Sequence, residues 1–357
     1  QGDAERALAA MKDASRYTRG HLSRDAVRAL YGDAVTLSAS RMDKARSCHF
    51  AYFMRYGLRA KERTGAGFDA PQIGTFVHDV MENTLRAAKE RGGLHALSEE
   101  ALHELVRASI EAYIDRVLPD LNEKSARFQY LFRRLCAAVD RIMDEVSEEL
   151  QSSDFEPLAF ELEFGADGQL PAITVREEGN TARVVGKVDR VDGWEHGGKL
   201  YIRIVDYKSG KKKFALSDVW QGMGLQMLLY LFTLEKHGAE RYGKEIVPAG
   251  VLYVPAHDIL VRADKRLSDE EIVAEKARKL HRSGLILSET EVVEAMEHGE
   301  ALQFLPLYRG KLAAEALATA EQLGKLSRFL EETLSNMAGE LRGGSIAADP
   351  WYENDRA

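Results

Sequence analysis

The sequence predicts an α/β fold with a central mixed β-sheet flanked by helices, preceded by a helical N-terminal region and followed by C-terminal helices. Residues 3–150 are rich in Ala, Leu, Glu, Arg and Met at helical spacing. Near residue 155 the pattern changes to short apolar runs bounded by glycines, which is typical of strands. A helical pattern then separates two strands, which allows parallel pairing through a right-handed crossover.

Composition indicates a soluble globular chain. Its 357 residues are 45% hydrophobic and 30% charged, which suits one large domain or two to three small ones. The net charge of −8 gives no general indication of nucleic-acid binding, so local clusters must be considered. No apolar run approaches the roughly 20 residues of a membrane span, and no secretory signal is visible. Two distant cysteines indicate a reducing, cytoplasmic location.

The first part of the chain is expected to be helical. Ser38 or Ser40 suits the start of the third helix, and Gly92-Gly93 suits the end of the fourth. The expected helices are 3–16, 23–31, 40–57, 74–91, 98–116 and 123–152.

The expected strands follow. Residues 157–164, 181–194, 200–208 and 247–256 have strand patterns, and the paired glycines of 195–199 indicate a hairpin turn. Residues 216–238 form an amphipathic helical pattern ended by Gly238. Residues 268–283 and 312–341 are expected to be helical again.

A carboxylate and an ammonium end one of the apolar strands. Asp206 and Lys208 are two residues apart, so they share a face. The hairpin folds Asp189 of the preceding strand back beside them. Two carboxylates make an oxygen site for Mg²⁺, and a nearby lysine can orient a water for attack on a phosphodiester. A surface salt bridge at a strand end is the alternative.

Two further features belong to this hypothesis. Gln226 and Tyr230 lie four apart on the expected helix 216–238, so they share a face and could hold DNA or a water; an ordinary polar stripe is the alternative. His78 lies among apolar residues of the helix 74–91. It is either a structural histidine or a ligand for a divalent ion.

Basic stretches are candidates to contact nucleic acid. Lys211, Lys212 and Lys213 follow the strand 200–208, and "RYGLRAKER" spans 55–63. A solvated lysine loop is the alternative for the first stretch. The sequence has no G-x-x-x-x-G-K-[ST] motif, so ATP-driven unwinding would belong to other residues or to a partner subunit.

The motifs together resemble a known family. His78, "GKVDRVD" (186–192), "VDYKSG" (205–210) and "GLQMLLYL" (224–231) follow the order of RecB-type nucleases of the PD-(D/E)XK superfamily. Residues 29–63 and "PAGVLYVPAHD" (248–258) resemble more closely the C-terminal nuclease domain of the AddB family, the B subunits of bacterial AddAB helicase–nucleases. The resemblance runs from about residue 29 to the C-terminus and implies a restriction-endonuclease-like core.

The resemblance also implies roles for residues. His78, Asp189, Asp206 and the backbone carbonyl of Tyr207 would bind Mg²⁺, for which Mn²⁺ can substitute. Lys208 would be the catalytic lysine, with Gln226 and Tyr230 as an accessory motif. Val188 stands where the superfamily name has proline, which is common in the RecB branch.

An iron–sulfur cluster is a further implication. Cys48 matches the first of four cysteines that hold a [4Fe–4S] cluster in AddB-type nucleases, although His49 stands where proline is usual. "ADPWYENDRA" (348–357) resembles the approach to the other three, which are missing here. Cys136 is expected to be a core cysteine. We therefore expect an excised fragment, also because Gln1-Gly2 resembles a tag scar, and we expect no cluster in it.

These observations predict a Mg²⁺-dependent DNA nuclease, an exonuclease on a strand delivered by an AddA-type helicase subunit in double-strand break repair and recombination. The alternatives are a stand-alone RecB-type exonuclease and a non-catalytic DNA-binding module. We expect four parts: 1–28, a helical extension or linker; 29–152, helical and carrying His78; 153–260, the catalytic core; and 261–357, helical and truncated before the cluster cysteines.

Overall fold

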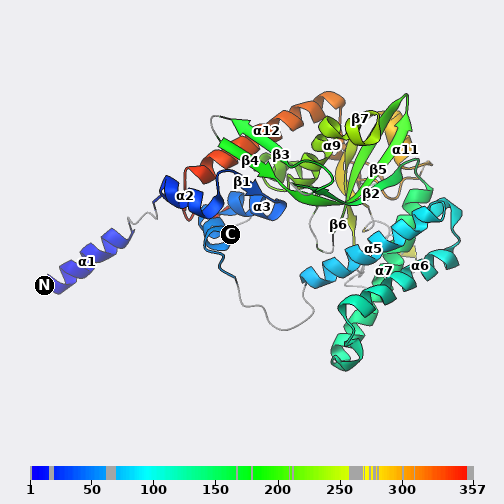
Figure 1. Ribbon diagram of the computed structural model, residues 1–357, viewed down its shortest axis with the longest axis horizontal. Coiled ribbons are helices and arrows are strands. Elements are labelled where there is room, and N and C mark those ends of the chain that lie inside the picture. Colours follow the sequence, from blue (N-terminus) through cyan, green and yellow to red (C-terminus); the bar gives the residue numbers. More distant parts are fainter. Residues whose placement is uncertain are drawn as a thin grey trace.

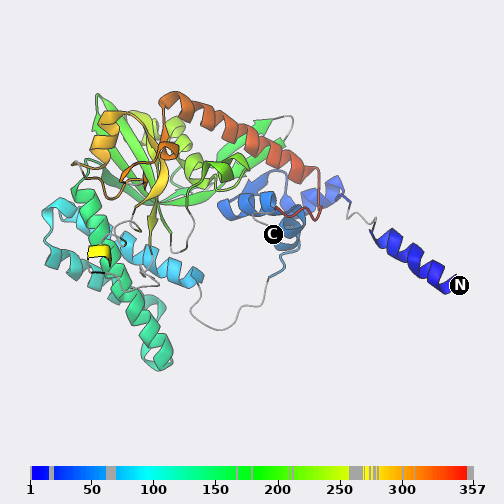
Figure 2. The ribbon, with the colours of Figure 1, turned by 180° about the vertical axis from the view of Figure 1, so that it is seen from behind.

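The computed structural model describes residues 2–15, 20–61, 70–165, 168–177, 180–208, 210, 213–256, 268, 270–272, 275, 279, 281–299, 301–308 and 310–351. In Figures 1 and 2 a twisted sheet forms the centre, one helical group covers one side of it, and a long C-terminal helix crosses the other. The predicted α/β class is confirmed.

A six-stranded mixed sheet is the core of the fold. Its strand order is β11-β8-β7-β6-β5-β2. Strands β5, β6 and β7 form its middle, with β5 antiparallel and β7 parallel to β6. The strands are β2 (Glu156–Phe164), β5 (Gly186–His196), β6 (Lys199–Lys208), β7 (Glu245–Pro255), β8 (Ser283–Leu287) and β11 (Leu317–Ala318).

The β5–β6 hairpin follows from its glycines. Gly197 and Gly198 have φ of 57° and 78°, in the left-handed region that a two-residue turn of this type requires. The last pair of the ladder is His196 with Lys199. This turn fixes the register of the two strands and therefore the position of every side chain at their far ends.

The predicted parallel crossover is confirmed. Strand β6 leads through α8 (Leu216–Trp220) and α9 (Gln226–Tyr242) into β7, and β6 and β7 pair in parallel. Strand β6 is buried along most of its length because it lies in the middle of the sheet with both faces covered.

One face of the sheet is covered by three helices. These are α5 (Ala70–Glu90), α6 (Glu99–Val117) and α7 (Ala126–Gln151), which lie together in Figure 1. Ser98 and Ser125 cap α6 and α7 through their hydroxyl groups. Apolar residues of the three helices pack with Phe160, Val205 and Tyr207 of the sheet in one buried cluster.

The other face carries a second, larger cluster. Helix α9 packs there with α12 (Ala320–Arg342) and α3 (Ala39–Ser47). A separate three-stranded sheet of order β1-β4-β3 packs against α12. Its strands are β1 (Val35–Leu37), β3 (Ile173–Glu177) and β4 (Asn180–Val184). The N-terminal helices are α1 (Gly2–Ser15), which projects from the rest in Figure 1, and α2 (Arg24–Tyr31).

Two of the expected helices are interrupted. The helix expected over 40–57 is α3, α4 (His49–Tyr52) and a π-helical turn at Phe53–Gly57. It breaks at the extended residue Cys48, and Phe50 donates its amide hydrogen to Ala347 instead of to the previous turn. The helix expected over 216–238 is divided into α8 and α9 because Gly222 and Gly224 have φ of 79° and 64°.

The strand expected over 181–194 is two strands. Val185 separates β4 from β5, and its amide hydrogen bonds to Leu37 of β1. The two parts belong to different sheets. The expected caps Ser38 and Ser40 bond to each other, and Ser38 makes no capping bond.

The C-terminal third differs most from expectation. Seven of the 16 residues in the helix expected over 268–283 lie outside the described residues. Residues 270–272, 275 and 279 are helical, and Ser283 begins strand β8. The helix expected from 312 begins at Ala320, after a Thr319 capping box. Short elements precede it that the sequence did not reveal: α11 (Thr290–Met296), β9 (Leu307–Tyr308), β10 (Lys311–Leu312) and β11. Among the described residues, no helix is both long and apolar enough to cross a membrane.

Candidate active site

Asp189 and Asp206 meet where the β5–β6 ladder ends. Arg190 pairs with Val205, so Asp189 and Asp206 come next, on the opposite face from those two side chains. Asp206 is only 7% exposed. Burial and then the neighbouring charge of Asp189 raise the pKa of Asp206 to about 6, against the opposite effect of Lys208. Two carboxylates close enough to raise a pKa in this way favour a cation between them.

His78 reaches the same strand ends from α5. Its Nδ1 lies 3.3 Å from Asp189 Oδ1, and its Nε2 lies 3.0 Å from the carbonyl oxygen of Tyr207. Burial alone would lower the pKa of His78, but the hydrogen bond and charge of Asp189 and the Tyr207 carbonyl raise it to about 9. The imidazolium therefore holds together two of the oxygen ligands that the resemblance implies.

Lys208 points toward the carboxylates. Its Nζ lies 2.6 Å from Asp206 Oδ2, so the two side chains form an ion pair. The ammonium also lies 5.1 Å from the centre of the Tyr253 ring on β7. This cation–π contact and the ion pair with Asp206 both favour the observed position of the ammonium.

Gln226 and Tyr230 lie on α9 and contact each other. Gln226 Nε2 donates to the Tyr230 hydroxyl at 3.2 Å. Tyr230 is 1% exposed and stacks on Phe164 at 4.8 Å between ring centres. A Cβ on Gly186 would lie 1.6 Å from the Tyr230 hydroxyl. Only glycine at the start of β5 therefore leaves room for the Tyr230 hydroxyl to pack against the backbone that leads to Asp189. Gln226 lies closer to the surface.

Glu161 is a further candidate that the sequence did not reveal. One ligand atom from each of His78, Glu161 and Asp189 lies within 4.8 Å of the others, a grouping that does not include Asp206. Glu161 has φ of 49°, and the β2–β5 ladder skips it between Phe160 and Leu162. This conformation is uncommon for a non-glycine residue and often marks a functional constraint. The alternation of "FELEF" does not distinguish Glu161 from Glu163.

Lys187 keeps Glu161 in place. The two side chains form an ion pair, and burial, ahead of the opposing effect of Lys187, raises the pKa of Glu161. Of the lysines predicted to contact DNA, Lys213 is exposed, while Lys211 and Lys212 lie outside the described residues.

Cys48 lies beside the C-terminal segment. Its Sγ is 3.9 Å from the carbonyl oxygen of Ala347, and Trp351 donates its amide hydrogen to Ser47 at 2.8 Å. His49 contacts Asp349 at 2.8 Å. The first predicted cluster cysteine is thus adjacent to the segment that resembles the approach to the others. Cys136 is on α7, and burial raises the pKa of its thiol to about 11. Two cysteines cannot provide the four thiolates of a [4Fe–4S] cluster.

Comparison with known proteins agrees with the fold. The model of the PD-(D/E)XK nuclease superfamily matches residues 36–351, so the chain belongs to this superfamily. Similar curated proteins are ATP-dependent helicase/deoxyribonuclease subunits B. That of Thermoanaerobacter sp. (strain X514) is 33% identical over 91% of this chain and 29% of its own length.

Two other relatives carry the same name. The protein from Caldanaerobacter subterraneus subsp. tengcongensis is 34% identical over 91% of this chain and 29% of its own length. The protein from Clostridium tetani is 32% identical over 92% of this chain and 29% of its own length. The chain therefore spans less than a third of the curated relatives that it matches.

Proposed function

We propose that this chain is the nuclease domain of an AddB-type subunit and hydrolyses DNA phosphodiester bonds with Mg²⁺ bound at the ends of β5 and β6. The observation that carries the proposal is the meeting of Asp189, Asp206, His78 and Lys208 at one strand end, in the chain order of the superfamily motifs. The names of the relatives support the deoxyribonuclease activity.

The residues present fit a divalent metal ion. Carboxylate oxygens of Asp189 and Asp206 with the Tyr207 carbonyl form an oxygen-rich set, which suits Mg²⁺. His78 already bridges two of these groups as an imidazolium. Ligation needs a neutral imidazole, so metal binding would release that proton. We include Glu161 among the ligands because of its place beside His78 and Asp189.

The metal ion and the side chains around it would have different roles in the reaction. A bound metal ion would polarise the phosphate and favour an attacking hydroxide. Lys208, held beside Asp206, would donate hydrogen bonds to the attacking water or to a phosphate oxygen and so orient the two reactants. Gln226 would hold the nucleic-acid backbone or a water at the edge of the site. The hydrogen bond between Gln226 and Tyr230 would keep Gln226 in position.

The wider setting is also proposed from the relatives. We infer that a DNA strand is delivered to this site by an AddA-type helicase subunit in the cytoplasm during double-strand break repair and recombination, and that it is cut as an exonuclease substrate. Lys211, Lys212 and Lys213 would contact the phosphates of that strand. For the [4Fe–4S] cluster, the cysteines of this chain do not fit, and we propose no role for iron in it.

A cleavage assay tests the proposal. Oligonucleotides, single- or double-stranded and labelled at either end, are incubated with the purified chain and Mg²⁺, Mn²⁺ or excess EDTA. We expect cleavage with Mg²⁺ and Mn²⁺ and none with EDTA, with the order in which labelled ends disappear giving the polarity. Cleavage that continues unchanged in EDTA would exclude metal-dependent hydrolysis, and intact DNA under all conditions would favour the DNA-binding module.

A further inference from the structure

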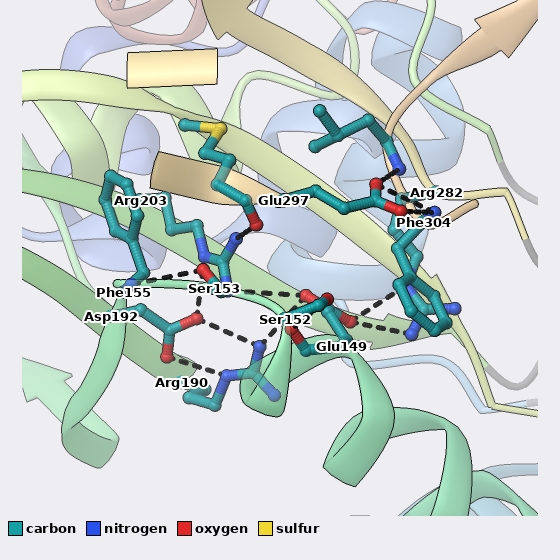
Figure 3. Close-up of polar contacts among 12 residues, drawn as sticks. Glu149, Ser152, Ser153, Phe155, Arg190, Asp192, Arg203, Arg282, Glu297 and Phe304 are labelled. Carbon is teal, nitrogen blue, oxygen red and sulfur yellow. Dashed lines mark hydrogen bonds and ion pairs between the residues drawn. The ribbon is translucent and has the colours of Figure 1, made fainter. Parts of the chain in front are cut away.

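Five charged side chains lie buried on the face of the sheet opposite Asp189 and Asp206. They come from α7, β5, β6 and the residue before β8, and each is at most 2% exposed. Figure 3 shows them meeting in one continuous network. The members are Glu149, Arg190, Asp192, Arg203 and Arg282.

The network is closely bonded. Arg190 and Arg203 both donate to Asp192 Oδ2 at 2.9 Å. Arg282 donates two hydrogen bonds to Glu149 Oε2, at 3.0 and 2.7 Å. The second carboxylate oxygen of Glu149 lies 3.5 Å from Arg190 Nη2 and 3.4 Å from Arg203 Nη2. Glu149 therefore joins α7 to both central strands.

Stability alone is a weak explanation for such a network. Removing charges from water costs several kcal/mol per ion, and well-packed apolar residues of similar volume are often as stabilising or more so. A guanidinium group, by contrast, fixes the direction of its partners because its donors form a rigid, planar fork. The network is better suited to holding atoms in place than to adding stability.

Tyr207 connects the network to the candidate active site. Its hydroxyl accepts a hydrogen bond from Arg190 Nη1 at 2.7 Å, at the buried end of the ring. Its backbone faces the other way: the amide hydrogen bonds to Asp189 Oδ2 at 2.8 Å, and the carbonyl oxygen contacts His78 at 3.0 Å. One residue thus joins the guanidinium group of Arg190 to two groups proposed to bind the metal.

Glu149 connects the network to the helices. It lies near the end of α7, whose apolar residues pack with those of α5 in one cluster. His78 is on α5. The ion pairs of Glu149 therefore fix the helical layer that brings His78 against the strands that carry Asp189 and Asp206.

We propose that Tyr207 and Glu149 are positioning residues for the metal site: Arg190 holds the Tyr207 ring, the Tyr207 backbone aligns Asp189 with its own carbonyl, and Glu149 sets the helices that present His78. The inference rests on the proposed function, because it requires a metal at this site. It concerns groups that do not bind the metal themselves but hydrogen-bond to its ligands and orient them. Loss of such a group typically weakens metal binding about ten- to a hundredfold.

Tyr207→Phe is the test, because it removes only the hydroxyl group. Mn²⁺ affinity of the purified chain is measured by calorimetry, without DNA, at a temperature where circular dichroism shows the variant folded. We expect the dissociation constant to rise about ten- to a hundredfold. Tyr201→Phe, on the same strand but outside the network, should bind Mn²⁺ like the wild type. Glu149→Gln should give a similar loss.

The outcomes separate the two proposals. Wild-type affinity in Tyr207→Phe overturns the positioning role, whatever its melting temperature. Failure of both variants to fold also overturns it, because the network would then serve the fold itself. If the wild-type chain binds no Mn²⁺, the proposed metal site fails and this inference fails with it. In the cleavage assay, Tyr207→Phe should need more metal for half-maximal rate, while kcat at saturating metal changes less.

Discussion

Asp206 illustrates what a single residue type at a strand end can and cannot reveal. Its spacing from Lys208 indicated a shared face, and the hairpin indicated Asp189 as a neighbour; the structure brings all three together. For His78 the residues alone left two interpretations open, a structural histidine or a metal ligand, because His78 is 129 residues from Tyr207 and no local pattern connects them. Only the family resemblance favoured the ligand. Glu161 escaped notice because its importance depends on a local backbone distortion that alternation does not encode.

The proposed role of Glu161 gives the first prediction. Glu161→Gln keeps the side-chain volume but removes the charge beside His78 and Asp189. We expect Mn²⁺ affinity to fall by about tenfold or more while the fold is retained. The reason is that losing even a group that only hydrogen-bonds to a metal ligand costs at least about tenfold in affinity. Calorimetry on Glu161→Gln and on Glu163→Gln, an exposed neighbour on the same strand, provides the comparison. Equal affinities in the two variants would assign Glu161 to its ion pair with Lys187 alone.

At the scale of elements, glycines and tertiary contacts explain most differences from the expected helices and strands. The sequence 216–238 has one helical pattern, yet Gly222 and Gly224 adopt left-handed conformations and divide it. The break at Cys48 depends on Ala347, about 300 residues away, which takes the amide hydrogen of Phe50. Strands β1 and β11, of three and two residues, are too short for any periodicity to reveal.

The lysine-rich segment after β6 gives the second prediction. Charge reversal of Lys211, Lys212 and Lys213 should weaken DNA binding and flatten its salt dependence. Each lost phosphate contact lowers the slope of log K against log salt by about 0.9 for duplex and about 0.7 for single strands. Fluorescence anisotropy across a salt series measures this slope. Lys311→Glu, at an exposed position on β10, is the control. A slope that does not change would mean that the DNA runs elsewhere.

At the scale of the whole molecule, two apolar clusters on opposite faces of the sheet hold the helices in place, and the general architecture could be predicted from hydrophobic patterns. The buried ionic network could not. Its members Glu149 and Arg282 are 133 residues apart, and nothing in the sequence distinguishes them from exposed charges. The network links the helical layer to the strands, so its protonation should affect the stability of the whole fold.

Glu149 gives the third prediction. Burial would raise the pKa of Glu149, but the charges of Arg282, Arg190 and Arg203 lower it to about 2, from 4.5 for an ordinary glutamate. A lowered pKa contributes stability above pH 4.5 that is lost as the pH falls toward 2. The shift corresponds to roughly 3 kcal/mol. Urea titrations give the difference in unfolding free energy between the wild type and Glu149→Gln. This difference should shrink as the pH falls from 4.5 toward 2. A difference that does not change with pH would contradict the lowered pKa of Glu149.

The central claim is that the ends of β5 and β6 form a metal-dependent nuclease site in which Asp206 binds the metal and Lys208 acts on the reactants. The most direct measurement compares Mn²⁺ binding and DNA cleavage in the same preparations of Asp206→Ala, Lys208→Ala and Lys199→Ala. Lys199, at the opposite end of β6 and paired with Glu245 at 2.7 Å, is the matched control.

We expect Asp206→Ala to lose both metal binding and cleavage, because a ligand is missing. Lys208→Ala should still bind Mn²⁺ but cleave at least about a hundredfold more slowly, the scale of losing one positioned hydrogen-bond donor. Lys199→Ala should behave like the wild type in both measurements. Cleavage at the wild-type rate by Asp206→Ala would contradict the account, since the site would then lie elsewhere in the protein.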